Sequence, residues 1–379
     1  MEVKPSIETF AKIKVVGVGG SGGSTVNHMV RSKIRGVEFI AVNTDAQALH
    51  HSLASVKLHI GKSTTRGLGA GMDPEMGRKA ADENQNEIRE ALKGSDMVFV
   101  TCGLGGGTGT GASPLVAEIG RDSGALTVAV VTKPFSFEGT QRRALSDRGL
   151  KELTEKVDTI ITIPNDRILE IVDKKMSLVE AFSVVNDVLR QGVQGIAELI
   201  TVPGLTNVDF ADVKAIMRDA GSALMGIGEG TGENRAIDAA KAAINSPLLE
   251  LSIEGAKGIL FNIIAGPDLK MHELADAAKV ITAQADPNAK IIYGTVIDEN
   301  MKDAVRITVI ATGFGEEGKA PPMRSEASYR PNLFMRKAEK PQAGTQKTAQ
   351  EKQTKEKEEV EEEDAAELDI PAFIRKKMG

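Results

Sequence analysis

The sequence predicts an α/β fold built on a parallel, doubly wound sheet, and two observations carry this prediction. Short apolar runs typical of buried strands alternate with segments whose apolar residues recur at helical spacing. Glycine-rich loops directly follow two of the apolar runs, at residues 17–22 and 105–111. This alternation is typical of a parallel sheet that is covered by helices on both faces.

The first half of the chain supplies most of the expected parallel strands. We expect strands at residues 13–18, 37–42, 97–101, 126–131 and 159–163, the last of which ends at Pro164. A helix is expected from Ser24, because Val26, Met29 and Val30 follow helical spacing. Another helix is expected over residues 113–122. The glycine-rich segments before these two helices are expected to be loops.

The second half is predicted to contain one long helix and a second α/β unit. Apolar residues recur at threes and fours over 177–200, and Pro203 ends the pattern. The further helices are expected near 209–218, 233–245 and 271–284, and the further strands at 257–264, 289–296 and 304–311. We place the domain junction on the long helix, with a first domain over 1–176, the helix over 177–203 and a second domain over 204–314.

The composition changes after Phe314, where Pro, Gln, Lys and Glu replace the apolar residues. A segment of this composition cannot form a core, so residues 315–366 are predicted to be a disordered linker. Apolar residues return beside basic ones from Leu368 to Lys377. We predict that residues 367–379 form a partner-binding peptide, the alternative being a plain disordered end.

Composition and charge exclude several classes of protein. The chain has 379 residues, a net charge of −6 and a single cysteine, Cys102. The charge argues against a nucleic-acid-binding protein, and one cysteine excludes an internal disulfide framework. The histidines lack metal-ligand spacing. No apolar run is long enough to span a bilayer, and the N-terminus does not resemble a signal peptide. We expect a cytoplasmic protein with no direct membrane insertion.

The loop at 105–111 is predicted to bind phosphate. Its glycines let successive N–H groups turn toward one point, and Thr108 and Thr110 add hydroxyl donors. An apolar segment that follows is expected to open a helix, and N–H groups at a helix N-terminus bind phosphate.

A second phosphate-type loop matches G-x-G-x-x-G at residues 17–22, with Asp45 further along the chain. Alone, this motif predicts a dinucleotide-binding Rossmann domain, so an NAD-dependent oxidoreductase is an alternative. A P-loop NTPase is excluded, because Gly61-Lys62-Ser63 would need glycine at the position of Val56. The loop at 67–74 could close over a terminal phosphate, or be an ordinary flexible loop.

The loop at 105–111 resembles the signature of the tubulin family, and residues from about 13 to 314 resemble the FtsZ family of cell-division GTPases. Supporting segments are 42–49, 132–135, 137–139, 163–166, 207–212 and 368–377. The resemblance implies a tubulin-like fold with a GTP-binding domain, a central helix, a C-terminal activation domain and a tail that binds partners.

The resemblance also implies a set of nucleotide-binding residues. Phosphate contacts are implied for Gly19, Gly20, Ser21, Gly22, Gly23, Ser24, Gly107, Thr108 and Gly109, and ribose or phosphate contacts for Glu138, Arg142 and Asn165. Asn43, Gly71, Gly103 and Gly106 complete the set. Phe182 would stack on guanine, and either Asn186 or Asp187 would bind the edge of the base. The alternatives are a core position for Phe182 and a solvated surface pair for Glu138 and Arg142.

No group that could activate water is evident beside the expected phosphates. The resemblance implies that Asn207, Asp209 and Asp212 enter the nucleotide site of a neighbouring copy, where they position or polarise the attacking water. The alternative for Asp209 is that it caps the following helix. A site completed by a neighbour operates only in a head-to-tail filament.

Some residues differ from those common in the family. Ser21 and Ser24 stand where glycine or alanine and asparagine are common, and Met72 and Asp73 replace Ala-Asn before Pro74. We expect Asp73 to place a carboxylate near the terminal phosphate, which would alter nucleotide affinity or assembly.

The function predicted is that of a polymerising GTPase that scaffolds the bacterial division ring. It would bind GTP or GDP with Mg²⁺ carried by the nucleotide, at mid-cell beneath the membrane. Its partners would be other copies of itself and, through Leu368 to Lys377, membrane-adaptor and regulatory division proteins. A nucleotide-binding scaffold with little turnover is a further alternative.

Overall fold

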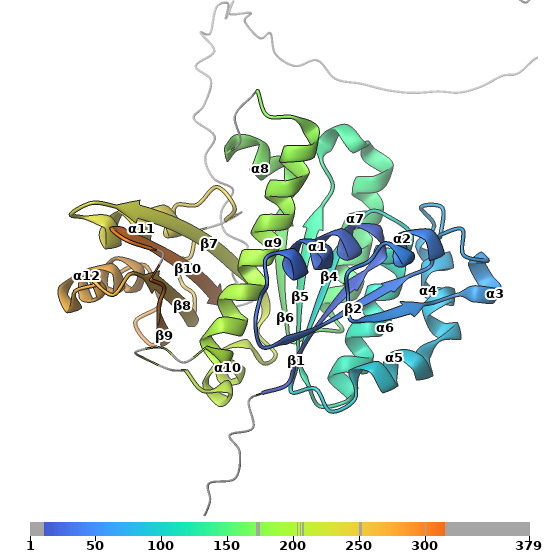
Figure 1. Ribbon diagram of the computed structural model, residues 1–379, viewed down its shortest axis with the longest axis horizontal. Coiled ribbons are helices and arrows are strands. Elements are labelled where there is room, and N and C mark those ends of the chain that lie inside the picture. Colours follow the sequence, from blue (N-terminus) through green and yellow to red (C-terminus); the bar gives the residue numbers. More distant parts are fainter. Residues whose placement is uncertain are drawn as a thin grey trace, which may run out of the picture. The chain divides into compact units, whose positions relative to one another are not determined.

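Strands and helices alternate along the chain around one ten-stranded sheet (Figure 1). The computed structural model describes residues 11–171, 175–202, 204, 206, 208–249, 252–299 and 301–314. These residues belong to the first of two units of the chain, Met1–Met323, and the second, Arg324–Gly379, lies outside them. The predicted linker at 315–366 and the predicted peptide at 367–379 therefore lie outside the described residues.

The strands occur in the sheet in the order β3-β2-β1-β4-β5-β6-β7-β10-β8-β9. Their bounds are β1 Ile13–Val18, β2 Val37–Asn43, β3 Val56–His59, β4 Met97–Gly103, β5 Leu126–Lys133, β6 Thr159–Pro164, β7 Gly221–Thr231, β8 Gly258–Ala265, β9 Lys290–Ile297 and β10 Ala304–Thr312. The α-helices are α1 Gly19–Arg31, α2 Ala46–His50, α3 Lys62–Thr65, α4 Pro74–Glu83, α5 Gln85–Leu92, α6 Thr108–Asp122, α7 Thr140–Thr154, α8 Asn165–Ile171, α9 Leu178–Thr201, α10 Phe210–Met217, α11 Arg235–Ile244 and α12 Met271–Thr282.

The first six strands of the sheet are all parallel, and helices cover both of their faces. Ile13 of β1 lies opposite Val37 on one side and Met97 on the other. Alternate residues point to opposite faces: Val15 packs in the core that contains α1 and α9, and Val16 in the core that contains α5, α6 and α7. The parallel doubly wound arrangement predicted from the sequence is confirmed.

Strand β7 connects this parallel sheet to the C-terminal strands and was not predicted. It pairs with β6 over three residues and runs antiparallel to β10. Its glycines give it a poor strand pattern. A Cβ at Gly226, Gly228 or Gly230 would lie only 2.0–2.1 Å from a carbonyl oxygen of α11. These glycines therefore allow α11 to pack directly on the strand.

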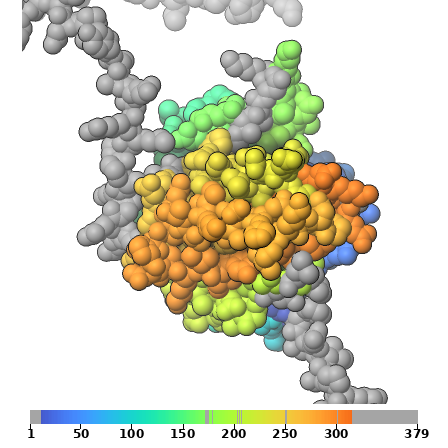
Figure 2. Space-filling view, turned by 90° about the vertical axis from the view of Figure 1, so that its left-hand side faces the viewer, coloured from blue at the N-terminus to red at the C-terminus, as the bar shows by residue number. Residues whose placement is uncertain are grey.

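The C-terminal strands form a mixed arrangement, with β8 antiparallel to β10 and parallel to β9. Helices α11 and α12 contribute to the core on one face of these strands, and α9 lies on the other. In Figure 2 the yellow and orange residues of this half face the viewer. No helix among the described residues is long and apolar enough to cross a membrane.

The ends of several helices differ from the prediction. Helix α1 begins at Gly19 and not at Ser24, and α6 begins at Thr108 and not near residue 113. In both cases the glycine-rich segment forms the first helical turn, against its low helix propensity. The central helix agrees with the prediction and begins with a capping box between Ser177 and Glu180.

Candidate functional site

A cavity of about 570 Å³ lies beside the C-terminal ends of the parallel strands. Its walls come from the loops that follow β1, β2, β4, β5 and β6, together with the segment before α4 and the first turns of α9. The predicted site residues that line it are Gly20, Ser21, Asn43, Gly71, Gly103, Gly106, Gly107, Thr108, Gly109, Glu138, Arg142, Asn165 and Phe182. Its volume falls in the range of small-molecule sites.

Two helices begin at the cavity with no side-chain cap. Helix α1 follows Val18 and α6 follows Gly107, and neither preceding residue caps the helix through its side chain. Neither helix has an acidic residue in its first turn. The first N–H groups of a helix have no partner within the helix, and the N-terminus carries partial positive charge. The two ends together favour an anionic ligand.

The glycines around the cavity serve two different purposes. A Cβ at Gly107 would lie 2.8 Å from the Ala70 Cβ, and one at Gly109 would lie 2.9 Å from the Gly103 carbonyl oxygen. Loop packing therefore requires these two glycines. In contrast, a Cβ at Gly20 or Gly106 would meet no atom within 4 Å, and neither residue has a positive φ. At these two positions glycine leaves room within the cavity itself.

Asn165 presents an unpartnered polar group at the cavity. The residue is 6% exposed, and its buried Oδ1 has no hydrogen-bond partner among the described residues. A buried polar atom of this kind is costly unless it is hydrogen-bonded. A ligand with hydroxyl or amide groups would satisfy it.

Phe182 lies at the edge of the cavity and not in the core, since it is 41% exposed. The alternative core position is therefore wrong. Its ring meets the buried Phe135 edge-on, with 5.5 Å between centroids, and Phe135 stacks on Phe137. One side of the Phe182 ring is thus held in place while the residue remains accessible to a planar ligand.

Glu138 and Arg142 form an ion pair on the cavity wall. The Arg142 Nη1 donates to Glu138 Oε2 at 2.6 Å, and the Phe135 N–H donates to Glu138 Oε1 at 2.9 Å. The Glu138 side chain is only 18% exposed. Glu138 is therefore largely shielded from solvent and held by two hydrogen bonds, so the alternative of a solvated surface pair is wrong.

The remaining predicted phosphate-loop residues, Gly19, Gly22, Gly23 and Ser24, do not line the cavity. A Cβ at Gly19 would lie 2.9 Å from the Gly109 amide nitrogen, and Gly19 has a φ of +73°. A Cβ at Gly22 would lie 2.4 Å from the Thr101 carbonyl oxygen. Gly19 therefore allows the two phosphate-type loops to approach each other, and Gly22 allows the start of α1 to pack against β4.

Asn186 and Asp187 also lie outside the cavity lining, and both join α9 to α1. The Thr25 hydroxyl donates to Asn186 Oδ1 at 3.0 Å, and Asp187 Oδ1 lies 3.3 Å from His28 Nε2. Burial alone would raise the pKa of Asp187. Hydrogen bonds from Arg190 and Gln191, the charge of Arg190 and the contact with His28 together lower the pKa to about 2.

Asp45 and Asp73 both have carboxylates that cap helices. Asp45 Oδ1 accepts the Gln47 and Ala48 N–H groups at the start of α2, and Asp73 Oδ1 accepts the Glu75 N–H at the start of α4. Met72, beside Asp73, lines the cavity with a φ of +65°. Met72, Thr132 and Pro134 also line the cavity, although the sequence analysis placed them only in the loop at 67–74 and in the segment 132–135 and gave them no contact with a ligand.

The predicted catalytic carboxylates lie at the start of α10, Asp209 as its N-cap and Asp212 in its first turn. Asp209 Oδ1 accepts the Asp212 N–H at 2.7 Å. Asp209 therefore caps α10, which is the alternative role expected from the sequence. Both residues are exposed. No hydrogen bond or ion pair of the Asp212 carboxylate is found in the part of the chain that the structure describes. Asn207 lies outside the described residues.

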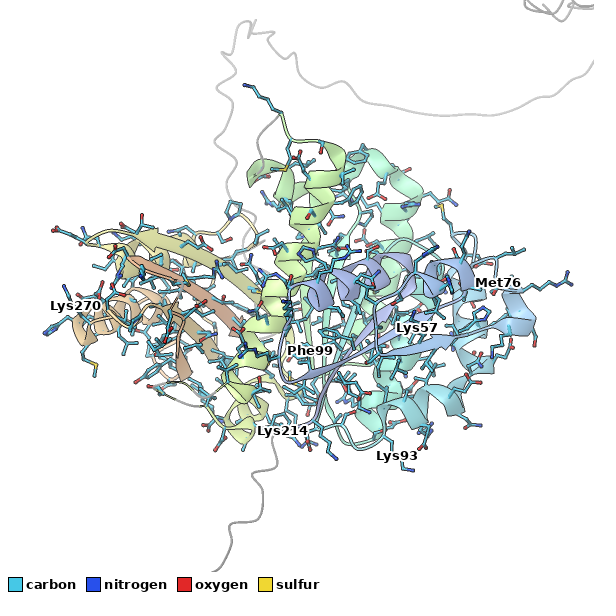
Figure 3. The ribbon with its side chains drawn as sticks, viewed as in Figure 1. Lys57, Met76, Lys93, Phe99, Lys214 and Lys270 are labelled. Carbon is cyan, nitrogen blue, oxygen red and sulfur yellow. The ribbon has the colours of Figure 1, made fainter. Side chains whose placement is uncertain are left out.

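Cavity and carboxylates lie at opposite ends of α9. Phe182 belongs to the first turns of this helix, and α10 follows its last residue, Thr201. A helix of 24 residues is about 36 Å long. Figure 1 shows α8 and α10 at the two ends of α9, and Lys214 of α10 lies at the lower edge in Figure 3. The two halves of the predicted site are not brought together within one chain.

The described residues contain no cluster of three or more His, Cys, Asp or Glu side chains that could hold a metal ion. Cys102, on β4, is buried, and burial raises the pKa of its thiol to about 12. The cysteine is therefore not a candidate nucleophile.

Comparisons with known proteins show the family to which the chain belongs. Residues 12–173 match the Tubulin/FtsZ family, GTPase domain, and residues 221–315 match the FtsZ family, C-terminal domain. An empty FtsZ dimer from M. jannaschii is 49% identical, with a TM-score of 0.78, and the match covers 81% of this chain and 90% of that chain. A point mutant of FtsZ from M. jannaschii is also 49% identical, with a TM-score of 0.77, and the match covers 80% of this chain and 91% of that chain.

More distant solved structures show the same fold. A GTPγS-bound protofilament of CetZ2 from Haloferax volcanii is 22% identical, with a TM-score of 0.67, and the match covers 79% of this chain and 92% of that chain. At this identity the similarity extends to the fold alone.

Proposed function

The chain belongs to the tubulin/FtsZ family of GTPases, and from this premise we propose that it hydrolyses GTP between successive copies in a head-to-tail filament. The cavity of one copy would bind the nucleotide, and the Asp209 and Asp212 region of the next would complete the site. The filament would scaffold the division ring at mid-cell, in the cytoplasm.

One observation carries the shared-site proposal: the exposed Asp212 carboxylate lies at the far end of α9 from the cavity. From Phe182 to the end of α9 the helix rises about 28 Å, which is too long for a side chain to bridge within one copy. A neighbouring copy that presents its α10 to the cavity would supply the carboxylate. Such a contact joins two different surfaces, so it repeats without closing and builds a filament.

We assign roles within the cavity from its chemistry. The uncapped ends of α1 and α6 would bind the phosphates, and Gly20 and Gly106 would leave room for them. Phe182 would stack on the base, and Asn165, Glu138 and Arg142 would contact the ribose or phosphates. Which of Asn186 and Asp187 binds the guanine edge stays open, since neither lines the cavity.

At the shared site, Asp209 would act mainly through Asp212. Its hydrogen bond to the Asp212 N–H fixes the first turn of α10, and the Asp212 carboxylate would then orient or polarise the attacking water. Asn207 is proposed to help position that water, as predicted from the sequence.

Magnesium would be held chiefly by the nucleotide. The carboxylates that line the cavity are those of Asp45 and Glu138, of which one caps α2 and the other pairs with Arg142. Mg²⁺ commonly binds phosphate oxygens and water with few protein ligands. When bound, it would neutralise phosphate charge.

The M. jannaschii FtsZ structure is described as a dimer, which supports self-association as a proposal for this chain. We propose that membrane-adaptor and regulatory division proteins bind through Leu368 to Lys377, which lie outside the described residues. The proposed domain boundaries are those given by the sequence, with the junction on α9.

The two alternative functions receive less support. For an NAD-dependent enzyme Asp45 would contact the ribose, whereas here its carboxylate caps α2. For a scaffold with little turnover Asp73 was expected to place its charge near the terminal phosphate, whereas its Oδ1 caps α4.

The test pairs phosphate release with sedimentation of polymers over a range of protein concentrations. We expect GTP hydrolysis to appear only above a threshold concentration at which polymer forms. Hydrolysis proportional to concentration down to the monomer would overturn the shared site. Polymer without phosphate release would instead favour the low-turnover scaffold.

Complementation between two impaired variants gives a sharper test, at a GTP concentration that fills the unmodified cavity and leaves the Gly106→Val cavity largely empty. Asp212→Ala keeps an intact cavity, and Gly106→Val keeps an intact Asp212. In an equal mixture that co-sediments, about a quarter of head-to-tail contacts would join an intact cavity to an intact carboxylate. Activity should therefore return on mixing, and a co-sedimenting mixture without activity would contradict the proposal.

A further inference from the structure

A buried hydroxyl lies behind the first turn of α6, where this turn meets the cavity. It belongs to Thr44, which follows the last residue of β2 and is 0% exposed. Thr44 does not line the cavity, whereas Thr108, the first residue of α6, does. The Oγ1 atoms of Thr44 and Thr108 lie 2.6 Å apart, within hydrogen-bond distance. The bond therefore joins a residue beyond the reach of a ligand to one that a ligand can contact.

The protons of this pair determine what Thr108 can offer to a ligand. A threonine hydroxyl has one proton to donate and two lone pairs that accept. Neither hydroxyl has a second hydrogen bond in the part of the chain that the structure describes. Phosphate oxygens accept hydrogen bonds, so Thr108 binds a phosphate through its hydroxyl only by donating this one proton. Thr44 must then be the donor within the pair.

The bond from Thr44 also strengthens Thr108 as a donor. A hydroxyl that accepts one hydrogen bond is polarised and donates the next more strongly. Thr108 is only 9% exposed, so water has little access to replace a missing partner. The loss of the Thr44 hydroxyl would therefore leave the Thr108 hydroxyl less well oriented toward the cavity.

The main chain of Thr44 makes separate contacts that a change of side chain would leave in place. The Thr65 hydroxyl donates to the Thr44 carbonyl oxygen at 3.3 Å, and the Gly69 N–H donates to the same oxygen at 3.4 Å. Valine has nearly the shape of threonine and lacks only the hydroxyl. A substitution to valine at position 44 therefore isolates the bond to Thr108.

We propose that Thr44 is a positioning residue for the nucleotide site: its hydroxyl donates to Thr108 Oγ1, and this bond directs the Thr108 proton toward a phosphate oxygen. The inference rests on the proposed nucleotide cavity. Because Thr44 acts only through Thr108, removal of its hydroxyl has no further effect once the Thr108 hydroxyl is gone.

The experiment is a double-mutant cycle that measures the affinity for a fluorescent GDP analogue. We expect Thr108→Val to weaken binding at least about tenfold and Thr44→Val about fivefold, the order of one hydrogen bond at a charged ligand. The double variant should bind no more weakly than Thr108→Val alone. Thr44→Ser keeps the hydroxyl and should bind within about twofold of the unmodified chain.

Thr101→Val is the matched control for the loss of a buried threonine hydroxyl. Thr101, on β4, is 0% exposed, and its hydroxyl has no partner among the described residues. It does not line the cavity. Its replacement should leave the affinity unchanged.

Additive losses in the double variant, or Thr44→Ser binding as weakly as Thr44→Val, would show that Thr44 acts through packing and would overturn the inference. Either result leaves the proposed function standing, whereas absence of binding by the unmodified chain would overturn the proposed function itself. Thermal denaturation shows which variants fold. If a valine variant does not fold, the alanine variant at the same position takes its place in the cycle and is judged by the same criterion.

Discussion

The cavity and the junction between α11 and α12 use polar groups in opposite ways. At the cavity, two helices begin without side-chain caps, and Asn165 Oδ1 has no partner among the described residues. At the other junction, the buried Arg235 donates to Asp268 Oδ2 at 2.5 Å, to Glu273 Oε1 at 2.8 Å and to the Asp268 carbonyl oxygen at 3.3 Å. Asp268 and Glu273 have lowered pKa values because they bond to this guanidinium.

The difference separates a binding site from a structural connection. Hydrogen-bonding capacity that a fold leaves unused around a cavity is available to a ligand, whereas a saturated network around a buried guanidinium only holds elements together. Asp209 and Asp212 show the same contrast on one helix, since the first caps α10 and the second has no partner for its carboxylate in the described chain.

The largest expected effect tests the unused carboxylate. Asp212→Ala should lower the rate of GTP hydrolysis at least about 100-fold, because general-base or water-orienting groups contribute rates of this order. Nucleotide affinity should be retained, since the cavity is far from α10. Phosphate release and binding of a fluorescent nucleotide measure the two properties. Near-normal turnover would show that the unpartnered Asp212 carboxylate is not needed for hydrolysis.

The saturated network should affect stability and not binding. Arg235→Met leaves Glu273 and the partly exposed Asp268 without their partner and should lower the free energy of unfolding by about 1–3 kcal/mol. Urea denaturation measures this change, with nucleotide affinity of the folded variant as the control. A large loss of affinity at unchanged stability would contradict the division between the two regions.

The same variant has a defined pH dependence. Arg235 holds the pKa values of Asp268 and Glu273 below their ordinary range, so the network stabilises the fold above the unfolded pKa values of these groups. The stability difference between the unmodified chain and Arg235→Met should shrink as the pH falls below about 4. Denaturation at pH 7 and pH 3.5 compares the two.

Two neighbouring glycines sharpen the comparison within the cavity. Gly106→Val should weaken nucleotide binding at least about tenfold with little change in Tm, because its side chain enters open space. Gly107→Val should instead destabilise the fold by about 1–3 kcal/mol, because its Cβ meets Ala70. Similar effects of both variants on Tm would show that Gly106 also serves packing.

The smallest expected effect concerns Phe182 at the edge of the cavity. Phe182→Ala should weaken binding of a guanine nucleotide about tenfold, the order expected for loss of base stacking. Its stability should change little, since Phe182 is 41% exposed. Calorimetry with GDP and thermal denaturation measure the two, and a large fall in Tm with unchanged affinity would return Phe182 to a packing role.

The sequence predicted those parts of the fold that depend on local patterns. The apolar runs of β1, β4 and β5 and the helical spacing of apolar residues over 177–200 are local features, and the structure contains the three strands and the long helix α9. Strand β7 was missed because its glycines are favourable only once α11 packs on them. The first turns of α1 and α6 were missed for a related reason, since tertiary packing outweighs their low helix propensity.

The site was predictable where a motif identified a loop. Residues 106–109 line the cavity as expected, whereas Thr110 is buried and its hydroxyl accepts the Gly105 N–H. Gly19 acts in packing between the two loops, and Gly22 in packing against β4. No local pattern distinguishes a glycine that packs from one that leaves space for a ligand. The local sequence likewise does not show that the Asp73 carboxylate caps α4, because that contact depends on the conformation of the preceding loop.

The length of α9 affects the spacing of nucleotide sites in the proposed filament. Because Phe182 lies near the start of α9 and Asp212 follows its end, about 28 Å of helix separates the two halves of the proposed site. Inserting or deleting a helical turn in α9 would change this span by about 5 Å and rotate one end of the helix relative to the other. In the proposed filament, the length of α9 would therefore contribute to the spacing between successive nucleotide sites.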